Sequence, residues 1–192
     1  MPTCPVELPI SGAALSAPHL LRTSMNAFQE ASQIEAIARR EILPWLHLKC
    51  ESVEDTGDSL WLQKIVGDFI VVQEGRKRGI ELKAEAKYTG NLFLETWSNL
   101  PELTPGWMLT SRADDLLYYF ADVKTLYSIK LRRLQEWAFG IGEKEGHIYK
   151  YREVAQAKYQ QINFTRGRLV PLHALEDARI PMRKYTADDR RQ

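Results

Sequence analysis

The 192-residue chain predicts an α/β domain in which an N-terminal helix precedes a meander of β-strands. Apolar residues recur at helical spacing between positions 25 and 43. Three strand-like segments, 60–66, 69–73 and 79–87, follow a polar connection at 51–58. Because the helix would lay one apolar stripe on the sheet, and because 192 residues suit a single domain, we expect one common core.

The expected helix is defined by its apolar stripe and its ends. Ser24 and Asn26 are candidate N-caps, and Pro44 should end or kink the helix because proline donates no backbone hydrogen bond. The stripe consists of Phe28, Ala31, Ile34, Ala38 and Ile42.

The expected meander turns through a charged hairpin at 74–79, which has a glycine at each end. A fourth strand is expected at 92–97. Further along, the pattern predicts strands at 116–120 and 126–129, helices at 131–139 and 149–161, and a hairpin of 162–164 with 168–172 through Arg166 and Gly167.

Composition limits the class of protein and its organisation. We expect an N-terminal arm at 1–20, one domain at 21–180 and a flexible tail at 181–192. No run of about 20 apolar residues predicts a membrane span, and two scattered cysteines indicate neither a disulfide framework nor a zinc site. Without a secretory signal pattern, a cytoplasmic location is the default expectation.

The segment Gly79-Ile80-Glu81-Leu82-Lys83-Ala84-Glu85 alternates apolar and charged residues. Side chains two residues apart on a strand point the same way, so Glu81 and Lys83 should lie side by side. An ordinary amphipathic strand with a solvated charged face gives the same pattern. Asp68, which follows Gly67 one strand earlier, adds a carboxylate that a hairpin would bring beside Glu81.

Paired carboxylates suit a hard divalent cation. Mg²⁺ takes oxygen ligands and keeps several waters, so one or two carboxylates and a substrate phosphate complete its shell. Such a cation activates water and offsets charge on phosphate, and an adjacent ammonium such as Lys83 stabilises the same charge.

Asp68 followed after a hairpin by Glu81-Leu82-Lys83 resembles the D…(D/E)-x-K signature of the PD-(D/E)XK nuclease superfamily, over residues 25–130. The resemblance implies a restriction-endonuclease-like core, with a mixed central sheet flanked by helices and the signature on adjacent strands after an initial helix. It also implies Mg²⁺ or Mn²⁺ held by Asp68 and Glu81, Lys83 as catalytic lysine, and hydrolysis of DNA phosphodiester bonds. Gly67 replaces the proline of the family name.

Many members of the family, including junction-resolving types, also carry a glutamate on the first helix near the metal. Glu30, Glu35 and Glu41 are candidates, and Glu35 is preferred as a metal ligand because it falls on the apolar stripe. The alternative is a partly exposed Glu35 that pairs with Arg39 one turn later. Glu95, on an otherwise apolar strand, is an additional candidate, and it could equally mark the wet face of an edge strand.

Partners are expected from local patches, because a net charge of +1 excludes a wholly basic surface. Arg76, Lys77 and Arg78 at the hairpin tip are expected to touch DNA backbone phosphates. Aromatic residues inside apolar runs, such as Trp107 and the Tyr118-Tyr119 pair, are interpreted as core. The compact size fits a small phage or mobile-element nuclease, and the sequence leaves a homodimer open. The alternative function is a catalytically inactive member of the same fold that binds nucleic acid or protein.

Overall fold

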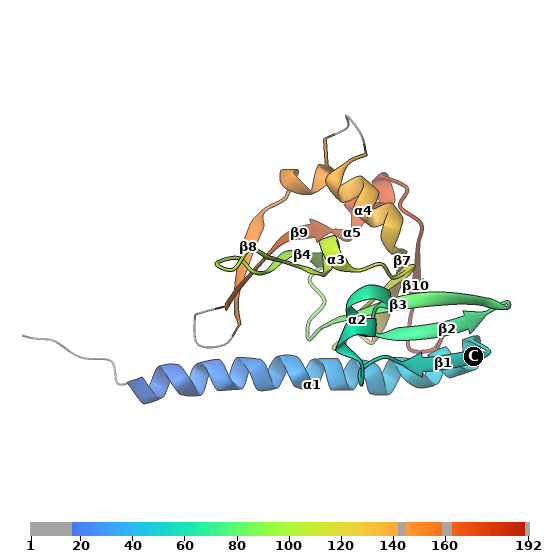
Figure 1. Cartoon of the computed structure of the whole chain (residues 1–192), viewed down its shortest axis with the longest axis horizontal. Helices are drawn as coiled ribbons and strands as arrows, with labels where there is room; N and C mark the ends of the chain where they lie inside the picture. Colours follow the sequence, from blue (N-terminus) through green and yellow to red (C-terminus); the bar gives the residue numbers. More distant parts are fainter. Residues whose placement is uncertain (1–16, 142–144, 159–162, 191–192) are drawn as a thin grey trace, which may run out of the picture.

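The computed structural model describes residues 17–141, 145–158 and 163–190 and has an α/β architecture with two sheets (Figure 1). The first sheet has the strand order β1 (Ser52–Asp55), β2 (Phe69–Gln73), β3 (Arg76–Glu85), β6 (Asp115–Phe120), β7 (Thr125–Lys130) and β10 (Met182–Tyr185). The second has the order β5 (Thr104–Pro105), β4 (Asn91–Asn99), β9 (Asn163–Pro171) and β8 (Glu153–Lys158). The first sheet is mixed because β3 and β6 run parallel while their neighbours run antiparallel, which confirms the predicted α/β class.

Helices lie on both sides of the six-stranded sheet. The long α1 runs along one face, and the second sheet with α3, α4 and α5 lies on the other side (Figure 1). The helical segments are α1 (Ala17–Lys49), α2 (Leu60–Val66), α3 (Trp107–Thr110), α4 (Leu131–Phe139), α5 (Leu172–Asp177) and the 3-10 helix η1 (His147–Lys150).

The first helix is longer than predicted at both ends. It begins at Ala17, so Ser24 and Asn26 lie inside α1 rather than at its start, and the expected arm at 1–20 overlaps it. Pro44 also lies inside the helix. The next two residues, Trp45 and Leu46, are buried against the sheet, and this burial offsets the hydrogen bond that proline cannot make.

The segment 60–66, predicted as a strand, is helix α2. Seven apolar-rich residues are too few for periodicity to separate the two structures, and the capping residues decide the outcome. The Ser59 hydroxyl accepts from the Leu62 amide at 3.4 Å, and Gly67 ends the helix with a φ of 93°. The third antiparallel strand is instead β1, inside the segment expected to be a connection.

The hairpin between β2 and β3 turns on two residues, Glu74 and Gly75, which both have positive φ angles. Gly79 was expected at the junction of the turn and the strand, and it lies within β3, which begins three residues earlier at Arg76. A Cβ atom there would stand 2.3 Å from the Val66 carbonyl oxygen, so glycine is required for the close approach of α2 to the strand.

The last third of the chain departs most from the prediction. The helix expected at 149–161 is replaced by η1 and β8, and its residues 159–161 lie outside the described part. Arg166 and Gly167, expected in a turn, lie within the continuous strand β9. The expected flexible tail contains β10, which pairs with β7. The strands at 116–120 and 126–129 and the helix at 131–139 are confirmed.

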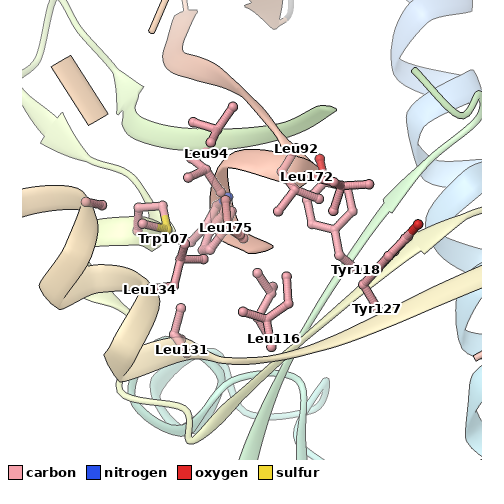
Figure 2. Close-up of a cluster of buried hydrophobic side chains, with 14 of the residues drawn as sticks. Leu92, Leu94, Trp107, Leu116, Tyr118, Tyr127, Leu131, Leu134, Leu172 and Leu175 are labelled. Atoms are coloured by element: carbon pink, nitrogen blue, oxygen red, sulfur yellow. The ribbon is translucent and has the colours of Figure 1, made fainter. Parts of the chain in front are cut away.

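Two hydrophobic clusters occupy the two faces of the six-stranded sheet. One, between the sheet and α1, contains Ala38 and Ile42 of the predicted stripe. The other joins the two sheets and includes Leu92 and Leu94 of β4, Leu116 of β6, Leu134 of α4 and Leu175 of α5 (Figure 2). Because β4 contributes to this cluster, the strand expected at 92–97 belongs to the second sheet and covers the first.

Candidate active site

Asp68 stands where α2 ends and β2 begins, and its carboxylate is buried and held from three sides. Oδ1 accepts from Arg39 Nη2 at 2.8 Å and from Gln63 Nε2 at 2.9 Å. Oδ2 accepts from the backbone N–H of Leu82 at 2.7 Å. Three donors from α1, α2 and β3 therefore fix the orientation of this carboxylate.

Glu81 and Lys83 project side by side from β3, as the alternation predicted. Lys83 Nζ lies 2.5 Å from Glu81 Oε1, and the Ser111 hydroxyl donates to Glu81 Oε2 at 2.8 Å. Glu81 is buried, while the Lys83 side chain keeps 32% of its surface exposed. The ammonium also lies 5.7 Å from the centre of the Trp107 ring.

The two carboxylates approach the same stretch of β3. Asp68 bonds the amide of Leu82, which separates Glu81 from Lys83. Burial lowers the pKa of Lys83, but the carboxylates of Glu81 and Asp68 outweigh burial, and the pKa stands above its ordinary value. Because Asp68 and Glu81 are both buried, the interpretation of β3 as a strand with a merely solvated charged face is wrong.

Glu95 comes to the same place from the second sheet. It lies in the middle of β4, and its charge also raises the pKa of Lys83. A Cβ atom at Gly106 would stand 2.7 Å from Glu95 Cγ, so the glycine before α3 makes room for this side chain. The structure thus brings the additional candidate within electrostatic range of Lys83.

Glu35 is not on the buried stripe where it was expected. Its side chain is 60% exposed and lies 3.5 Å from Arg39 Nε, which is the alternative that the sequence left open. Glu35 therefore reaches Asp68 only through Arg39. Glu41 accepts from the Tyr119 hydroxyl at 2.5 Å, and the side chain of Glu30 lies outside the described part.

The three basic residues of the hairpin do not share one face. Because side chains alternate along a strand, Lys77 lies on the same face as Glu81 and Lys83. Arg76 and Arg78 lie on the opposite face. Arg76 is exposed, whereas Arg78 pairs with the buried Asp115. Of the three predicted phosphate contacts, Lys77 alone is directed to the side of the candidate site.

Gly67, which precedes Asp68, has a backbone conformation that proline cannot adopt. Its φ of 93° is closed to proline, whose ring fixes φ near −65°. A Cβ atom would stand 2.3 Å from the Ile80 carbonyl oxygen, so any larger residue is also excluded. Glycine here permits the turn that places Asp68 against β3.

Sequence reasoning missed three of the residues that hold the site. Gln63 was assigned to a strand, Arg39 was considered only as a partner of Glu35, and Ser111 was not singled out. No pattern marks them, because each reaches the site from a different element. The interpretation of Trp107, Tyr118 and Tyr119 as core residues is confirmed by their burial.

Within the described ranges, no cluster of three or more His, Cys, Asp and Glu side chains is arranged to hold a metal ion. No helix in the described part is long and apolar enough to span a membrane. The chain matches no family model, no curated protein and no solved structure. The functional argument therefore depends on the geometry of Asp68, Glu81 and Lys83.

Proposed function

We propose that the protein is a metal-dependent nuclease that hydrolyses DNA phosphodiester bonds with Mg²⁺ or Mn²⁺. The observation that carries the proposal is that two carboxylates act on Lys83: Glu81 Oε1 lies 2.5 Å from its Nζ, and Asp68, which accepts from the Leu82 amide at 2.7 Å, also raises its pKa. Both carboxylates are buried, and Lys83 remains partly open to solvent.

The charge balance around these residues favours a cation. Arg39 is shared by Asp68, Asp55 and Glu35, and Lys83 faces Glu81, Asp68 and Glu95. Asp55 and Glu35 are exposed to solvent, whereas Asp68 and Glu81 are buried, and each of these two carboxylates has one cationic partner that it shares with other carboxylates. A shared cation neutralises a buried carboxylate incompletely, which favours the binding of a further cation.

Asp68 and Glu81 suit a cation whose coordination shell is completed by water and substrate. Asp68 and Glu81 supply hard oxygen donors, and Mg²⁺ is commonly held by one or two carboxylates with waters and substrate phosphate. When bound, the ion would supply an activated water and offset charge on the phosphate. Arg39, Gln63 and Ser111 keep the two carboxylates oriented for this task.

Lys83 acts by charge in this proposal. Because its pKa is raised, the ammonium stays protonated through neutral pH and is a poor proton acceptor. Its role is to stabilise negative charge on the phosphate and to orient a water through its N–H donors.

The arrangement of elements also supports a restriction-endonuclease-like core. The long first helix precedes the two adjacent strands that carry Asp68 and Glu81, the order that the resemblance to PD-(D/E)XK nucleases implies. The parallel pairing of β3 with β6 makes the central sheet mixed, as that core requires.

Cleavage assays test the proposal. Purified protein is incubated with single-stranded, duplex and branched DNA in Mg²⁺, in Mn²⁺ or in chelator. Cleavage should require the metal and fall at least about 100-fold in Lys83→Ala, a loss typical of a group that stabilises transition-state charge. The matched control is Lys87→Ala, an exposed lysine just beyond β3, which should cleave normally.

A catalytically inactive DNA-binding module is the second candidate, and the lack of a ready cluster of three acidic ligands within the described ranges favours it. Metal-independent DNA binding with no cleavage under any metal would support this candidate. Cleavage that persists in chelator or in Lys83→Ala would overturn the nuclease proposal.

A further inference from the structure

A hollow lies on the face of the six-stranded sheet opposite to Glu81 and Lys83, between the sheet and the last turns of α1. It has a volume of about 680 Å³ and is lined by residues of α1, β2, β3, β6, β7 and β10. α1 lies beside β1 and β2 at this end (Figure 1) and leaves the far strands of the face partly open. The volume falls within the range of small-molecule sites, roughly 300–1,000 Å³.

The floor and one wall of the hollow are apolar. Val71, Ile80 and Leu117 form the floor and are buried. Trp45 of α1 and Tyr185 of β10 stand against each other with ring centres 5.1 Å apart. Such a surface suits the flat or aliphatic body of an organic molecule.

The rim carries an excess of positive charge. Lys49, Arg78, Lys130 and Arg183 line it, against the carboxylates of Glu74 and Asp115. Asp115 is already bound by both Arg78 and Lys130. Lys49 and Arg183 are exposed and form no ion pair within the described ranges, so they are available to an anionic group.

The wall also holds a buried donor. Trp45 is 8% exposed, and its indole N–H has no hydrogen-bond acceptor among the described residues. A buried donor left unpaired costs about 1–3 kcal/mol, so an acceptor brought by a ligand would stabilise the folded state.

We propose that this hollow binds a small organic anion with an apolar body, of the class of aryl sulfonates and carboxylates. The apolar part lies on the floor against Trp45 and Tyr185, and the anionic group meets Lys49 and Arg183. The site is separate from the Asp68 site, because Arg78 and Ile80 face this hollow while Glu81 and Lys83 face the other side of β3.

A matched pair of fluorescent probes tests the proposal. 8-Anilinonaphthalene-1-sulfonate carries the anion, and N-phenyl-1-naphthylamine has the same ring system without it. The full chain should bind the sulfonate at least about tenfold more tightly, because only the sulfonate meets the rim cations. Equal affinity for the two probes, or no binding of either, would overturn the proposal.

Substitutions test whether the sulfonate probe binds in the hollow. The double variant Lys49→Glu and Arg183→Glu should remove the preference for the sulfonate, whereas Lys150→Glu, an exposed lysine on η1, should keep it. Trp45→Phe keeps the apolar wall, removes the indole N–H and should weaken the sulfonate severalfold. Urea unfolding of each variant must remain cooperative, which separates lost binding from lost folding.

Cys50, which lines the same hollow, provides a local readout. In a Cys4→Ser background, saturating sulfonate should slow iodoacetamide labelling of Cys50 severalfold. Binding without such protection would place the probe elsewhere and contradict the assignment. A wild-type dimer that Arg183→Glu converts to monomer would show that a second copy covers the hollow and would also overturn the ligand proposal.

Discussion

The two faces of the β3–β6 strand pair carry buried carboxylates with different cationic partners. On one face, Glu81 pairs with a single cation, Lys83, which Asp68 and Glu95 also attract. On the other face, the single carboxylate of Asp115 is bound by both Arg78 and Lys130, the latter at 2.8 Å. Strand alternation separates the two clusters, although their residues are near neighbours in sequence.

Burial of an acidic residue therefore does not by itself indicate a cation site. Asp115 and Glu81 are almost equally buried, at 5% and 6% exposure. Two cationic side chains already bind the Asp115 carboxylate, so it is a poor ligand for a metal ion. Glu81 shares its one cation with Asp68, whereas the hollow beside Asp115 retains excess positive charge. The local balance decides which kind of partner each face favours.

The largest expected effect is on stability, and it compares the loss of each of the two buried carboxylates. Asp115→Asn should lower the free energy of unfolding by about 2–3 kcal/mol, somewhat less than for a fully enclosed pair because Lys130 is 46% exposed. Glu81→Gln should lower it by less, about 1–2 kcal/mol, because the amide oxygen still accepts from Ser111 and Lys83, which loses its partner, is partly exposed and keeps the attraction of Asp68 and Glu95. Urea denaturation without metal measures both. Equal losses would show that the two faces do not differ.

The next effect separates the two additional glutamates. Glu95→Gln should weaken Mn²⁺ binding, measured by calorimetry, about tenfold. Glu95 offsets part of the positive charge of Lys83, so its loss leaves that ammonium more repulsive to a bound cation. Glu35→Gln, which reaches the site only through Arg39, should change the affinity less than about twofold. If Glu35→Gln weakens binding more than Glu95→Gln, the first helix supplies the ligand after all.

Neighbouring cations on β3 provide a smaller contrast. Lys77→Ala should weaken duplex DNA binding severalfold and reduce the slope of log affinity against log salt by about one, because one phosphate contact is lost. Arg76→Ala removes the same charge from the opposite face and should leave the slope unchanged. A fluorescence anisotropy titration at several salt concentrations distinguishes them. An equal response would mean that DNA approaches the hairpin tip itself.

The smallest effect concerns Glu85, further along the site face. Burial raises its pKa, while hydrogen bonds from the Tyr118 hydroxyl and the Phe93 amide lower it, and burial prevails. A carboxyl with a raised folded-state pKa stabilises the fold at low pH and loses that contribution as pH rises through the raised value. Glu85→Gln should therefore raise the melting temperature at pH 7.5, by about 1–2 °C, with little change at pH 4. A larger gain at pH 4 would contradict the sign of the shift.

Residues 69–139 were the most predictable part of the chain. Strict alternation identified β3, and short apolar runs between turn residues identified β2, β6 and β7, because these strands bury a face along their whole length. Their adjacency in sequence also made Asp68, Glu81 and Lys83 a recognisable set. A hairpin brings its own residues together by local geometry alone.

The same reasoning was wrong where short segments depend on distant partners. Helix α2 required its caps at Ser59 and Gly67 and the close approach at Gly79 to be recognised as a helix. Strands β9 and β10 form because β4 and β7 offer edges far away in the sequence, and β8 then pairs with β9. Weak local patterns cannot indicate such pairing.

The sequence by itself determined that one strand places a carboxylate and an ammonium side by side, since a period of two is a property of any extended chain. Tertiary structure alone decided what surrounds them. Arg39 arrives from α1, Gln63 from α2, Glu95 from the second sheet and Ser111 from the loop after α3. Alternation along one strand is local, whereas the charge balance of a site is summed over every element that packs against it.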